Sequence, residues 1–459
     1  MMACAVGIAG IAALIGNRSG TPAEVQGAPL LPPFAAAAAT AGPASATGMA
    51  GLARAAGTNA PAAAAAGAKP ATAAALAELL DLDQLTLTAT GDHYEAQLKD
   101  GRHAVLTLDP GLQAYAERLL DEARAPRGAI VAMAPDGRIL ALAGRRGDEH
   151  RAKKAVAGAA TSASPAMPSF DWRIATDVWA PAASVFKLVT ASALVAAGVD
   201  PSDKVCFHGG IRSVLESNLR DDKRDSRCES LLYGVAHSNN AILGKLAFQK
   251  LQPDALDKLA HALGVSDTLP GTELRGSAGA LDLPVAHDLS FAQAAAGFAG
   301  SQLSAVGGAL LAATFADDGE QPVPRIVASI DGVAQVAPSR RRAVTAEIAK
   351  AVGKMMMATC EIGSAAKSFG RHQAIRVAGK TGTLTRTDPF YMEHSWFVGY
   401  APAEQPQIVV SVVLGNPENW HLRGHEAARR LIDRALAPPA TGRNKDRSPK
   451  VSSTRRVGW

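Results

Sequence analysis

The chain has 459 residues, and 47% of them are hydrophobic, which is enough to bury a substantial core and excludes a wholly disordered chain. Its length fits one large domain or two ordinary ones, with tails. The net charge of +5 lies entirely in residues 438–459, which hold six basic residues and one acid. Since the rest of the chain is neutral and no aromatic residues alternate with basic ones, nothing favours nucleic acid as a partner.

Residues 1–16, MMACAVGIAGIAALIG, are uncharged and mostly apolar. They are slightly short for a membrane-spanning helix, which needs about 17–25 residues, and they lack the basic start of a signal peptide. Two interpretations stay open: an export or anchor segment whose basic start is missing, or a fortuitous apolar start. We favour the first and predict an export or membrane-anchor segment over residues 1–19. Lipid modification of Cys4 is disfavoured because no apolar stretch precedes it.

Residues 20–77 are dominated by Ala, Pro, Gly and Thr, show no apolar periodicity, and are predicted to form a disordered linker. Residues 78–437 are predicted to form the folded domain. The basic residues 438–459 are predicted to be a disordered, solvated tail, and the alternative is contact with anionic wall polymers or lipid head groups. No second catalytic domain is expected ahead of the fold, since the residues there are too few and too simple.

Strands are expected between residues 85 and 109, followed by a helix over 110–124 with Asp109 as its N-cap. A hairpin follows around the turn sequence Pro135-Asp136-Gly137. The pattern then predicts, in order, a mostly helical centre, three strands and a final helix, over residues 185–312, 375–415 and 424–436. This order indicates the α/β class, of the α+β type: an antiparallel central sheet flanked by helices, with an inserted, mostly helical subdomain.

Four cysteines are present, Cys4, Cys206, Cys228 and Cys360. No C-x-x-C pair occurs, which argues against a structural zinc site, and no metal is expected. Cys206 and Cys228 bracket a polar segment and are a candidate disulfide in an oxidising compartment; the alternative is two unrelated buried thiols. Cys360 is expected to be a core thiol.

Three short motifs are candidates for carrying chemistry. In Ser184-Val-Phe-Lys187, the hydroxyl and the amine lie one helical turn apart and can hydrogen-bond, as an activated nucleophile requires. The same S-x-x-K pattern recurs at Ser364-Ala-Ala-Lys367, so the pattern alone indicates no more than a surface helix turn.

The second motif, Ser238-Asn239-Asn240, precedes a helical pattern, and its alternative interpretation is a helix N-cap. The third, Lys380-Thr381-Gly382-Thr383, lies in a strand pattern, where glycine is unfavourable unless something must approach the backbone closely. A tight turn is the alternative there. The order is more specific: Ser238 follows Ser184 by 54 residues and Lys380 follows after a further 142, whereas no S-x-N separates Ser364 from Lys380.

This order of motifs resembles the penicillin-binding protein and serine β-lactamase superfamily. Further segments between residues 106 and 436 look like successive landmarks of a monofunctional transpeptidase domain: TLDPGLQ, GAIVAMAPDGRILALAG, AASVFKLVTA, VAGKTGT and SWFVGYAP. One departure is visible, because Pro181-Ala182-Ala183 stands where the family often has Pro-Gly ahead of the serine. The departure concerns the shape of that loop.

The resemblance implies that Ser184 forms an acyl-enzyme with a D-Ala-D-Ala amide, that Lys187 is its base, and that Ser238 relays a proton. Asn240 would bind the amide side chain of the substrate, and Lys380 would lower the pKa of Lys187. The terminal carboxylate would be held by Lys380, Thr381, Gly382 and Thr383. The backbone N–H groups of Ser184 and Thr383 would form the oxyanion hole, and no cofactor is required.

The function implied is a penicillin-binding D,D-transpeptidase that cross-links peptidoglycan stem peptides. The resemblance places it at the periplasmic face of the inner membrane, tethered by its N-terminus or secreted to the periplasm. β-Lactams are expected as covalent inhibitors and cell-wall synthases as partners. Three alternatives stay open: a D,D-carboxypeptidase, a β-lactamase, and a non-catalytic β-lactam sensor or cell-wall scaffold. Glu273 lies in the sequence range of the glutamate that class A β-lactamases use, but without the surrounding pattern.

Overall fold

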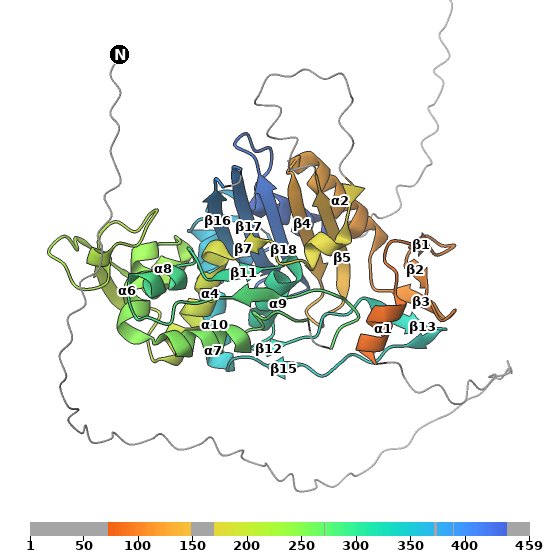
Figure 1. Cartoon of the computed structure of the whole chain (residues 1–459), viewed down its shortest axis with the longest axis horizontal. Helices are drawn as coiled ribbons and strands as arrows, with labels where there is room; N and C mark the ends of the chain where they lie inside the picture. The colour runs from red at the N-terminus through yellow and green to blue at the C-terminus, as the bar shows by residue number, and fades with distance from the viewer. Residues whose placement is uncertain (1–71, 148–168, 270, 371–373, 389, 438–459) are drawn as a thin grey trace, which may run out of the picture. The chain divides into compact units, whose positions relative to one another are not determined.

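The computed structural model describes residues 72–147, 169–269, 271–370, 374–388 and 390–437 (Figure 1). The predicted N-terminal segment, Cys4, the basic tail and nearly all of the predicted linker lie outside the described residues. Across the described part of the chain, no helix combines the length and the hydrophobicity that crossing a membrane requires.

The centre of the fold is a six-stranded sheet in the order β16-β17-β18-β4-β5-β6, antiparallel throughout (Figure 1). Its strands are β4 (Arg127–Met133), β5 (Ile139–Arg146), β6 (Ser169–Phe170), β16 (Ala378–Arg386), β17 (Met392–Ala401) and β18 (Ile408–Asn416). The predicted hairpin, β4 with β5, therefore pairs with the last strand of the chain, because β18 lies beside β4. The predicted antiparallel central sheet is confirmed.

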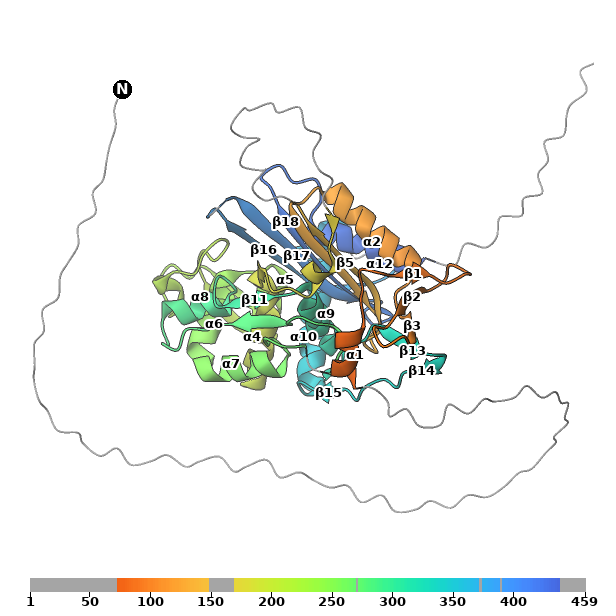
Figure 2. The same cartoon turned by 45° about the vertical axis from the view of Figure 1, so that its right-hand side comes forward.

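Helices cover both faces of this sheet. One face carries α2 (Pro110–Ala123) and α12 (Gly424–Ala435), and the other carries α9 (Ala305–Ala316) and α10 (Ala346–Glu361) (Figure 2). Along β4, Ile130 packs into the core under α2 and α12, while its neighbour Val131 packs into the core on the opposite face. This alternation is the one that strand geometry requires, and it gives two hydrophobic cores separated by the sheet.

A mostly helical subdomain lies beside the sheet, as the sequence predicts. Its helices are α4 (Lys187–Ala196), α5 (Leu231–Ala236), α6 (Asn240–Lys250), α7 (Pro253–Ala262) and α8 (Leu289–Ala295). Short strands interrupt it: β7 (Ala180–Pro181), β10 (Gly279–Leu281) and β11 (Ser301–Leu303) form one small sheet, and β8 (Lys204–Phe207) pairs with β9 (Arg227–Ser230). The subdomain meets the central sheet where the 3-10 helix η2 (Ala183–Phe186) packs on β16.

A second small sheet joins the start of the domain to a segment more than 200 residues further along the chain. It contains β1 (Thr86–Leu87), β2 (Tyr94–Gln97), β3 (His103–Leu106), β13 (Val327–Ile330) and β14 (Val333–Ala334). The remaining elements are η1 (Trp172–Ala175), η3 (Glu216–Asn218), α11 (Ala366–Phe369) and the pair β12 (Glu320–Gln321) with β15 (Arg341–Arg342).

The folded domain begins earlier than the predicted boundary at residue 78. Helix α1 (Ala73–Leu79) starts at Thr72, whose side chain accepts a hydrogen bond from the N–H of Ala75. Leu76 is only 2% exposed and packs into the core beside β2 and β3. The end of the predicted linker is therefore a helix, which Leu76 and the partly buried Leu79 attach to the core.

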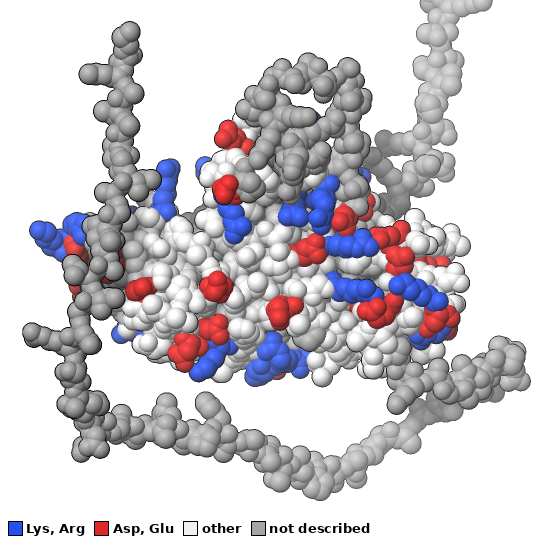
Figure 3. Space-filling model, in the orientation of Figure 1, with Lys and Arg blue, Asp and Glu red and all other residues white. Residues whose placement is uncertain are grey.

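Charged side chains are spread over the surface of the domain. On the face shown in Figure 3, basic and acidic side chains are intermingled, and no extended area carries a single sign. Exposed pairs such as Arg173 with Asp83 and Arg275 with Glu78 are typical, and such pairs stabilise a fold by less than about 1 kcal/mol each. This distribution agrees with a folded domain whose net charge is close to zero.

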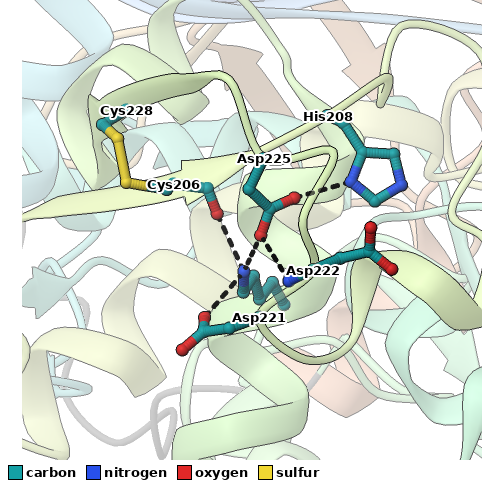
Figure 4. Close-up of a disulfide and its surroundings, with 7 residues drawn as sticks. Cys206, His208, Asp221, Asp222, Asp225 and Cys228 are labelled. Carbon is teal, nitrogen blue, oxygen red and sulfur yellow. Dashed lines mark hydrogen bonds and ion pairs between the residues drawn. A yellow bond between two sulfur atoms is a disulfide. The ribbon is translucent and has the colours of Figure 1, made fainter.

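Cys206 and Cys228 form a disulfide between β8 and β9, where the two residues stand opposite each other (Figure 4). The bond closes the chain between them, here called the 207–227 segment. Cys360, near the end of α10, is a buried thiol, 1% exposed, and packs in the same core as α2 and α12.

Replacing both Cys206 and Cys228 with serine is expected to lower the free energy of unfolding by about 3 kcal/mol. The physical reason is that the cross-link restricts the unfolded chain over a loop of 22 residues. Urea unfolding followed by circular dichroism measures the change. Dithiothreitol should bring the wild type down to the level of the double variant and leave the variant unchanged; equal unfolding midpoints without reductant would rule out the stabilisation.

Candidate active site

The three predicted motifs meet in one cleft of about 720 Å³ between the helical subdomain and the edge strand β16. The cleft is lined by Ser184, Ser238, Asn240, Thr381 and Thr383. Lys187 and Lys380 lie beneath its floor with 0% of each residue exposed. The structure thus brings together residues that are separated by up to 199 positions in the chain.

Ser184 lies on η2, which continues directly into α4. The loop ahead of it is fixed by the indole of Trp396, whose Nε1 donates to the carbonyl of Pro181 at 2.9 Å. Ala183 adopts the left-handed region with φ at +49°, a conformation that glycine adopts without strain. The departure from the family's Pro-Gly therefore leaves the shape of the turn in place and puts strain in the residue beside the serine.

Replacing Ala183 with glycine is expected to raise the free energy of unfolding by up to about 1 kcal/mol. Relief of about 1–2 kcal/mol of left-handed strain exceeds the added flexibility of the unfolded chain. Ala182 is the matched control, because it is equally buried but has φ at −61°, so Ala182→Gly should lower stability by about 0.5–1 kcal/mol. Thermal unfolding of the two variants compares them, and equal losses would refute the strain at Ala183.

Lys187 makes three short contacts with hydrogen-bond acceptors. Its Nζ lies 2.8 Å from Ser184 Oγ, 2.7 Å from Asn240 Oδ1 and 2.6 Å from the carbonyl of Ala296. The last two atoms can only accept, whereas a hydroxyl can also donate. A neutral amine has two N–H bonds and one lone pair, so when the N–H bonds go to Asn240 and Ala296, the lone pair faces the hydroxyl of Ser184. The geometry suits proton transfer from Ser184 to Lys187.

The environment of both lysines favours their neutral forms. Burial, together with the nearby positive charge of Lys380, holds the pKa of Lys187 well below its usual value. Burial also lowers the pKa of Lys380, to about 7. A neutral lysine as a base near pH 7 is therefore compatible with this site.

Ser238 lies in the loop between α5 and α6 with φ at +56°. Its Oγ accepts a hydrogen bond from Lys380 Nζ at 3.1 Å, and the same amine donates to the carbonyl of Thr381 at 2.9 Å. Ser238 therefore connects the helical subdomain to β16. Asn239, in contrast, is the N-cap of α6, since its side chain accepts from the N–H of Ile242.

Asn240 has both ends of its amide bonded within the protein. Its Oδ1 accepts from Lys187, and its Nδ2 donates to the carbonyl of Ile211 at 3.1 Å. The sequence predicts a contact between Asn240 and the substrate. In the structure Asn240 lines the cleft, is 7% exposed and also holds Lys187 in position, so its contact with the substrate stays a prediction.

Gly382 lies where β16 packs against η2. A β-carbon on this residue would lie 3.2 Å from a methyl of Val185 and 3.1 Å from the β-carbon of Trp396. A side chain there would crowd Val185 and Trp396, which favours a glycine in the middle of this strand. The predicted neighbours Thr381 and Thr383 flank it along the cleft.

Ser364, the serine of the second S-x-x-K, also lines the cleft, although the sequence gives no role to it. Its Oγ lies 2.6 Å from Thr381 Oγ1. Lys367, its partner in the pattern, is not among the residues that line the cleft. The second S-x-x-K pattern therefore does not mark a nucleophile. The fold shows instead that Ser364 contacts β16 through Thr381.

Glu273 lies outside this cleft. It lines a separate pocket of about 380 Å³ beside Arg275 and Trp172, and its carboxylate accepts from the N–H of Ile326 at 3.3 Å. Burial raises its pKa. The carboxylate that lines the cleft is that of Glu393, and it faces Arg423 at 4.0 Å.

The model of the penicillin binding protein transpeptidase domain matches residues 128–435. The peptidoglycan D,D-transpeptidase PbpA of Mycobacterium tuberculosis is 26% identical over 311 residues, which are 63% of this chain and 62% of that protein. The stage V sporulation protein D of Bacillus subtilis is 26% identical over 359 residues, which are 73% of this chain and 53% of that protein. The chain thus spans less than two thirds of the length of either relative.

Solved structures share the fold. The imipenem acyl-enzyme complex of penicillin-binding protein A from M. tuberculosis has a TM-score of 0.58 at 23% identity, covering 73% of this chain and 80% of that one. PBP2 of Pseudomonas aeruginosa also has a TM-score of 0.58, at 24% identity, covering 74% and 80%. The predicted fold class is therefore confirmed.

Proposed function

The chain belongs to the penicillin-binding protein transpeptidase family, and from this premise we propose that it is a D,D-transpeptidase that cross-links peptidoglycan stem peptides through Ser184. The observation that carries the proposal is the contact between Ser184 Oγ and the buried Lys187 Nζ at 2.8 Å. A hydroxyl beside a buried amine whose pKa is lowered is an activated nucleophile.

In the proposed reaction, Ser184 Oγ attacks the carbonyl carbon of a D-Ala-D-Ala amide while its proton passes to Lys187. The negative charge that develops on the carbonyl oxygen is stabilised by backbone N–H groups, for which those of Ser184 and Thr383 are the candidates. Collapse of the tetrahedral intermediate breaks the C–N bond, and the leaving D-alanine amine takes up the proton that Lys187 had accepted, so Lys187 is neutral again in the acyl-enzyme. Ser238, bonded to Lys380, is the proposed route for that proton.

The terminal carboxylate of the donor peptide is proposed to bind at β16, to the hydroxyls of Thr381 and Thr383 and to the charge of Lys380. Both threonines line the cleft, and Lys380 lies directly behind them. An amine of a second stem peptide then attacks the serine ester, which releases Ser184 and forms the cross-link. The amine loses a proton to Lys187, and Lys187 passes a proton to the departing Ser184 Oγ, which restores the starting state.

Two alternatives differ in the fate of the acyl group. A β-lactamase needs a base that activates water at the ester, and the candidate for that role, Glu273, lines a different pocket. Glu393 lines the cleft, but its carboxylate faces Arg423 at 4.0 Å. A D,D-carboxypeptidase would use the same residues and water as acceptor, so the acceptor must be determined by experiment.

The test is turnover of a stem-peptide donor ending in D-Ala-D-Ala, with and without a second peptide that carries a free amine. Mass spectrometry is expected to find an amide-linked dimer that increases with the amine concentration. Release of D-alanine without any dimer would instead establish a carboxypeptidase. Rapid hydrolysis of penicillin would establish a β-lactamase, and no covalent intermediate with either compound would leave only a sensor or scaffold.

The rate of acylation is expected to follow a bell-shaped pH profile. At low pH the base Lys187 becomes protonated and the rate falls. On the alkaline side Lys380, with its pKa at about 7, loses the charge proposed to bind the carboxylate, so the rate falls again above that value. Penicillin acylation measured between pH 4 and 10 reports both limbs. In Lys380→Arg the fall in rate on the alkaline side should begin at a higher pH. A fall at the same pH as in the wild type would mean that another group causes it.

We also propose that the protein acts at the periplasmic face of the inner membrane, where its disulfide can form. In this proposal residues 1–19 export or anchor the chain, residues 20–72 separate the anchor from the domain, and other cell-wall synthases are its partners. Fractionation of cells followed by accessibility of an introduced cysteine to a membrane-impermeant reagent tests the location. Labelling only after lysis would refute it.

A further inference from the structure

We propose that Arg212 determines specificity by binding a second carboxylate on the stem peptides, distinct from the terminal carboxylate assigned to β16. The inference deepens the proposed transpeptidase function and rests on it. Arg212 belongs to the 207–227 segment, which the disulfide closes, and it lines the same cleft as Ser184.

Hydrogen bonds and an ion pair hold the 207–227 segment in place. Asp225 sits between two partners: its Oδ1 is 2.6 Å from His208 Nδ1, and its Oδ2 accepts from Lys245 Nζ at 2.7 Å (Figure 4). Lys245 is 1% exposed and also donates to the carbonyl of Cys206 at 2.8 Å. The disulfide and a buried ion pair thus fix both ends of the segment on α6.

Residues near the start of the segment are hydrogen-bonded to Asn240 of the candidate active site. The carbonyl of Gly210 accepts from the backbone N–H of Asn240 at 2.8 Å, and the carbonyl of Ile211 accepts from its side chain at 3.1 Å. Because Asn240 also holds Lys187, the backbone next to Arg212 is fixed relative to the proposed nucleophile. Such support is what a residue needs to select among substrates.

Charge in the cleft singles out Arg212. The guanidinium of Arg423 faces Glu393 at 4.0 Å and stacks on Trp420 at 4.3 Å, so this pair is nearly neutral. The pKa of His237 is lowered by desolvation, which keeps this imidazole neutral at pH 7. Arg212 is exposed and has no ion pair or side-chain hydrogen bond with any of the residues that the structure describes.

An unpaired guanidinium in a substrate cleft favours an anion. Its five N–H donors match the two oxygens of a carboxylate, and it stays charged at every pH at which the reaction runs. The peptide carboxylate proposed for Lys380 binds at β16, whereas Arg212 belongs to the 207–227 segment, next to the helical subdomain. The second carboxylate therefore belongs to a side chain of the donor upstream of the scissile bond, or to the acceptor peptide.

The experiment compares matched peptides, one with a free side-chain carboxylate and one with that group amidated. The change is made first in the donor and then in the acceptor, which separates the two sources. The wild type is expected to prefer the carboxylate form by about tenfold to a hundredfold in kcat/KM, in one arm only. Arg212→Ala should abolish the preference by slowing only the carboxylate form, and Arg212→Glu should reverse it.

Arg220→Ala is the matched control. Arg220 lies on the same segment and is exposed, and its contact within the described part of the chain is with the ring of Phe248, at 5.9 Å. It should retain the wild-type preference. Equal slowing of both peptides in Arg212→Ala would show a structural role and overturn the proposal, as would a wild type with no preference. Labelling with fluorescent penicillin separates this proposal from the proposed function. Equal labelling of all variants is expected even if only the Arg212 proposal fails. A wild type that is not labelled would overturn both the Arg212 proposal and the proposed transpeptidase function.

Discussion

Replacing Ser184 with alanine is expected to abolish covalent labelling by a fluorescent penicillin. No other described hydroxyl in the cleft lies beside Lys187 Nζ, so removal of Oγ leaves no nucleophile next to the base. No labelling should be detectable, because the variant lacks the oxygen atom that would form the ester bond. Gel fluorescence and intact-protein mass spectrometry measure it, and the variant should unfold at the wild-type temperature within a few degrees, since Ser184 is only partly buried.

Ser364→Ala is the matched control. Ser364 belongs to an identical S-x-x-K pattern and lines the same cleft, but its hydroxyl contacts Thr381 rather than a lysine. This variant should still become fully labelled. Labelling that survives in Ser184→Ala, or disappears in Ser364→Ala with the fold intact, would show that the nucleophile has been assigned to the wrong motif.

Replacing Lys187 with methionine is expected to slow acylation by roughly 10²–10⁴-fold, the range that a positioned general base contributes. Methionine nearly preserves the volume of this fully buried side chain, so the core stays filled. It also removes the donor to Asn240 Oδ1 and to the carbonyl of Ala296. Stopped-flow measurement of acylation gives the rate, and full labelling at long times shows that Ser184 remains in place.

Lys367→Met provides the corresponding control, since Lys367 occupies the same place in the second S-x-x-K and lies outside the lining of the cleft. Its acylation rate should match that of the wild type. A Lys187→Met variant that acylates at the wild-type rate would mean that another group takes the proton. A variant that loses both labelling and its cooperative unfolding transition would be replaced by Lys187→Arg, which keeps the donors to Asn240 and Ala296 but has no basic lone pair near pH 7.

Local signals in the sequence predicted the regular elements well. Asp109 caps α2 through a hydrogen bond to the N–H of Leu112, and the helix ends one residue from the predicted position. Gly137 takes φ of +93° in the turn between β4 and β5, as a turn at that place requires. These features depend on neighbours within a few residues, so their physical causes are present in any short window of the chain.

Features that depend on distant pairing were not predictable in this way. Helix α1 was missed because Leu76 and Leu79 attach it to a core that is assembled from distant segments of the chain. β3 pairs with β13, and the hydrophobic pattern of neither segment indicates the other as its partner. The same holds for Asn240: its residue type suggests a contact with substrate, but its partners, Lys187 and Ile211, are set by the fold.

The hydrogen bonds of the site also have a consequence for folding kinetics. Lys187 is bonded to a residue 53 positions away within the subdomain, and Ser238 is bonded to a residue 142 positions away, across the boundary between subdomain and sheet. Contacts of such sequence separation form late, because the closure of long loops must precede them. A chain that has acquired its helices and hairpins but has not docked β16 on η2 is therefore still inert. Reactivity toward penicillin would then appear only with the last steps of folding, and so report on complete assembly of the domain.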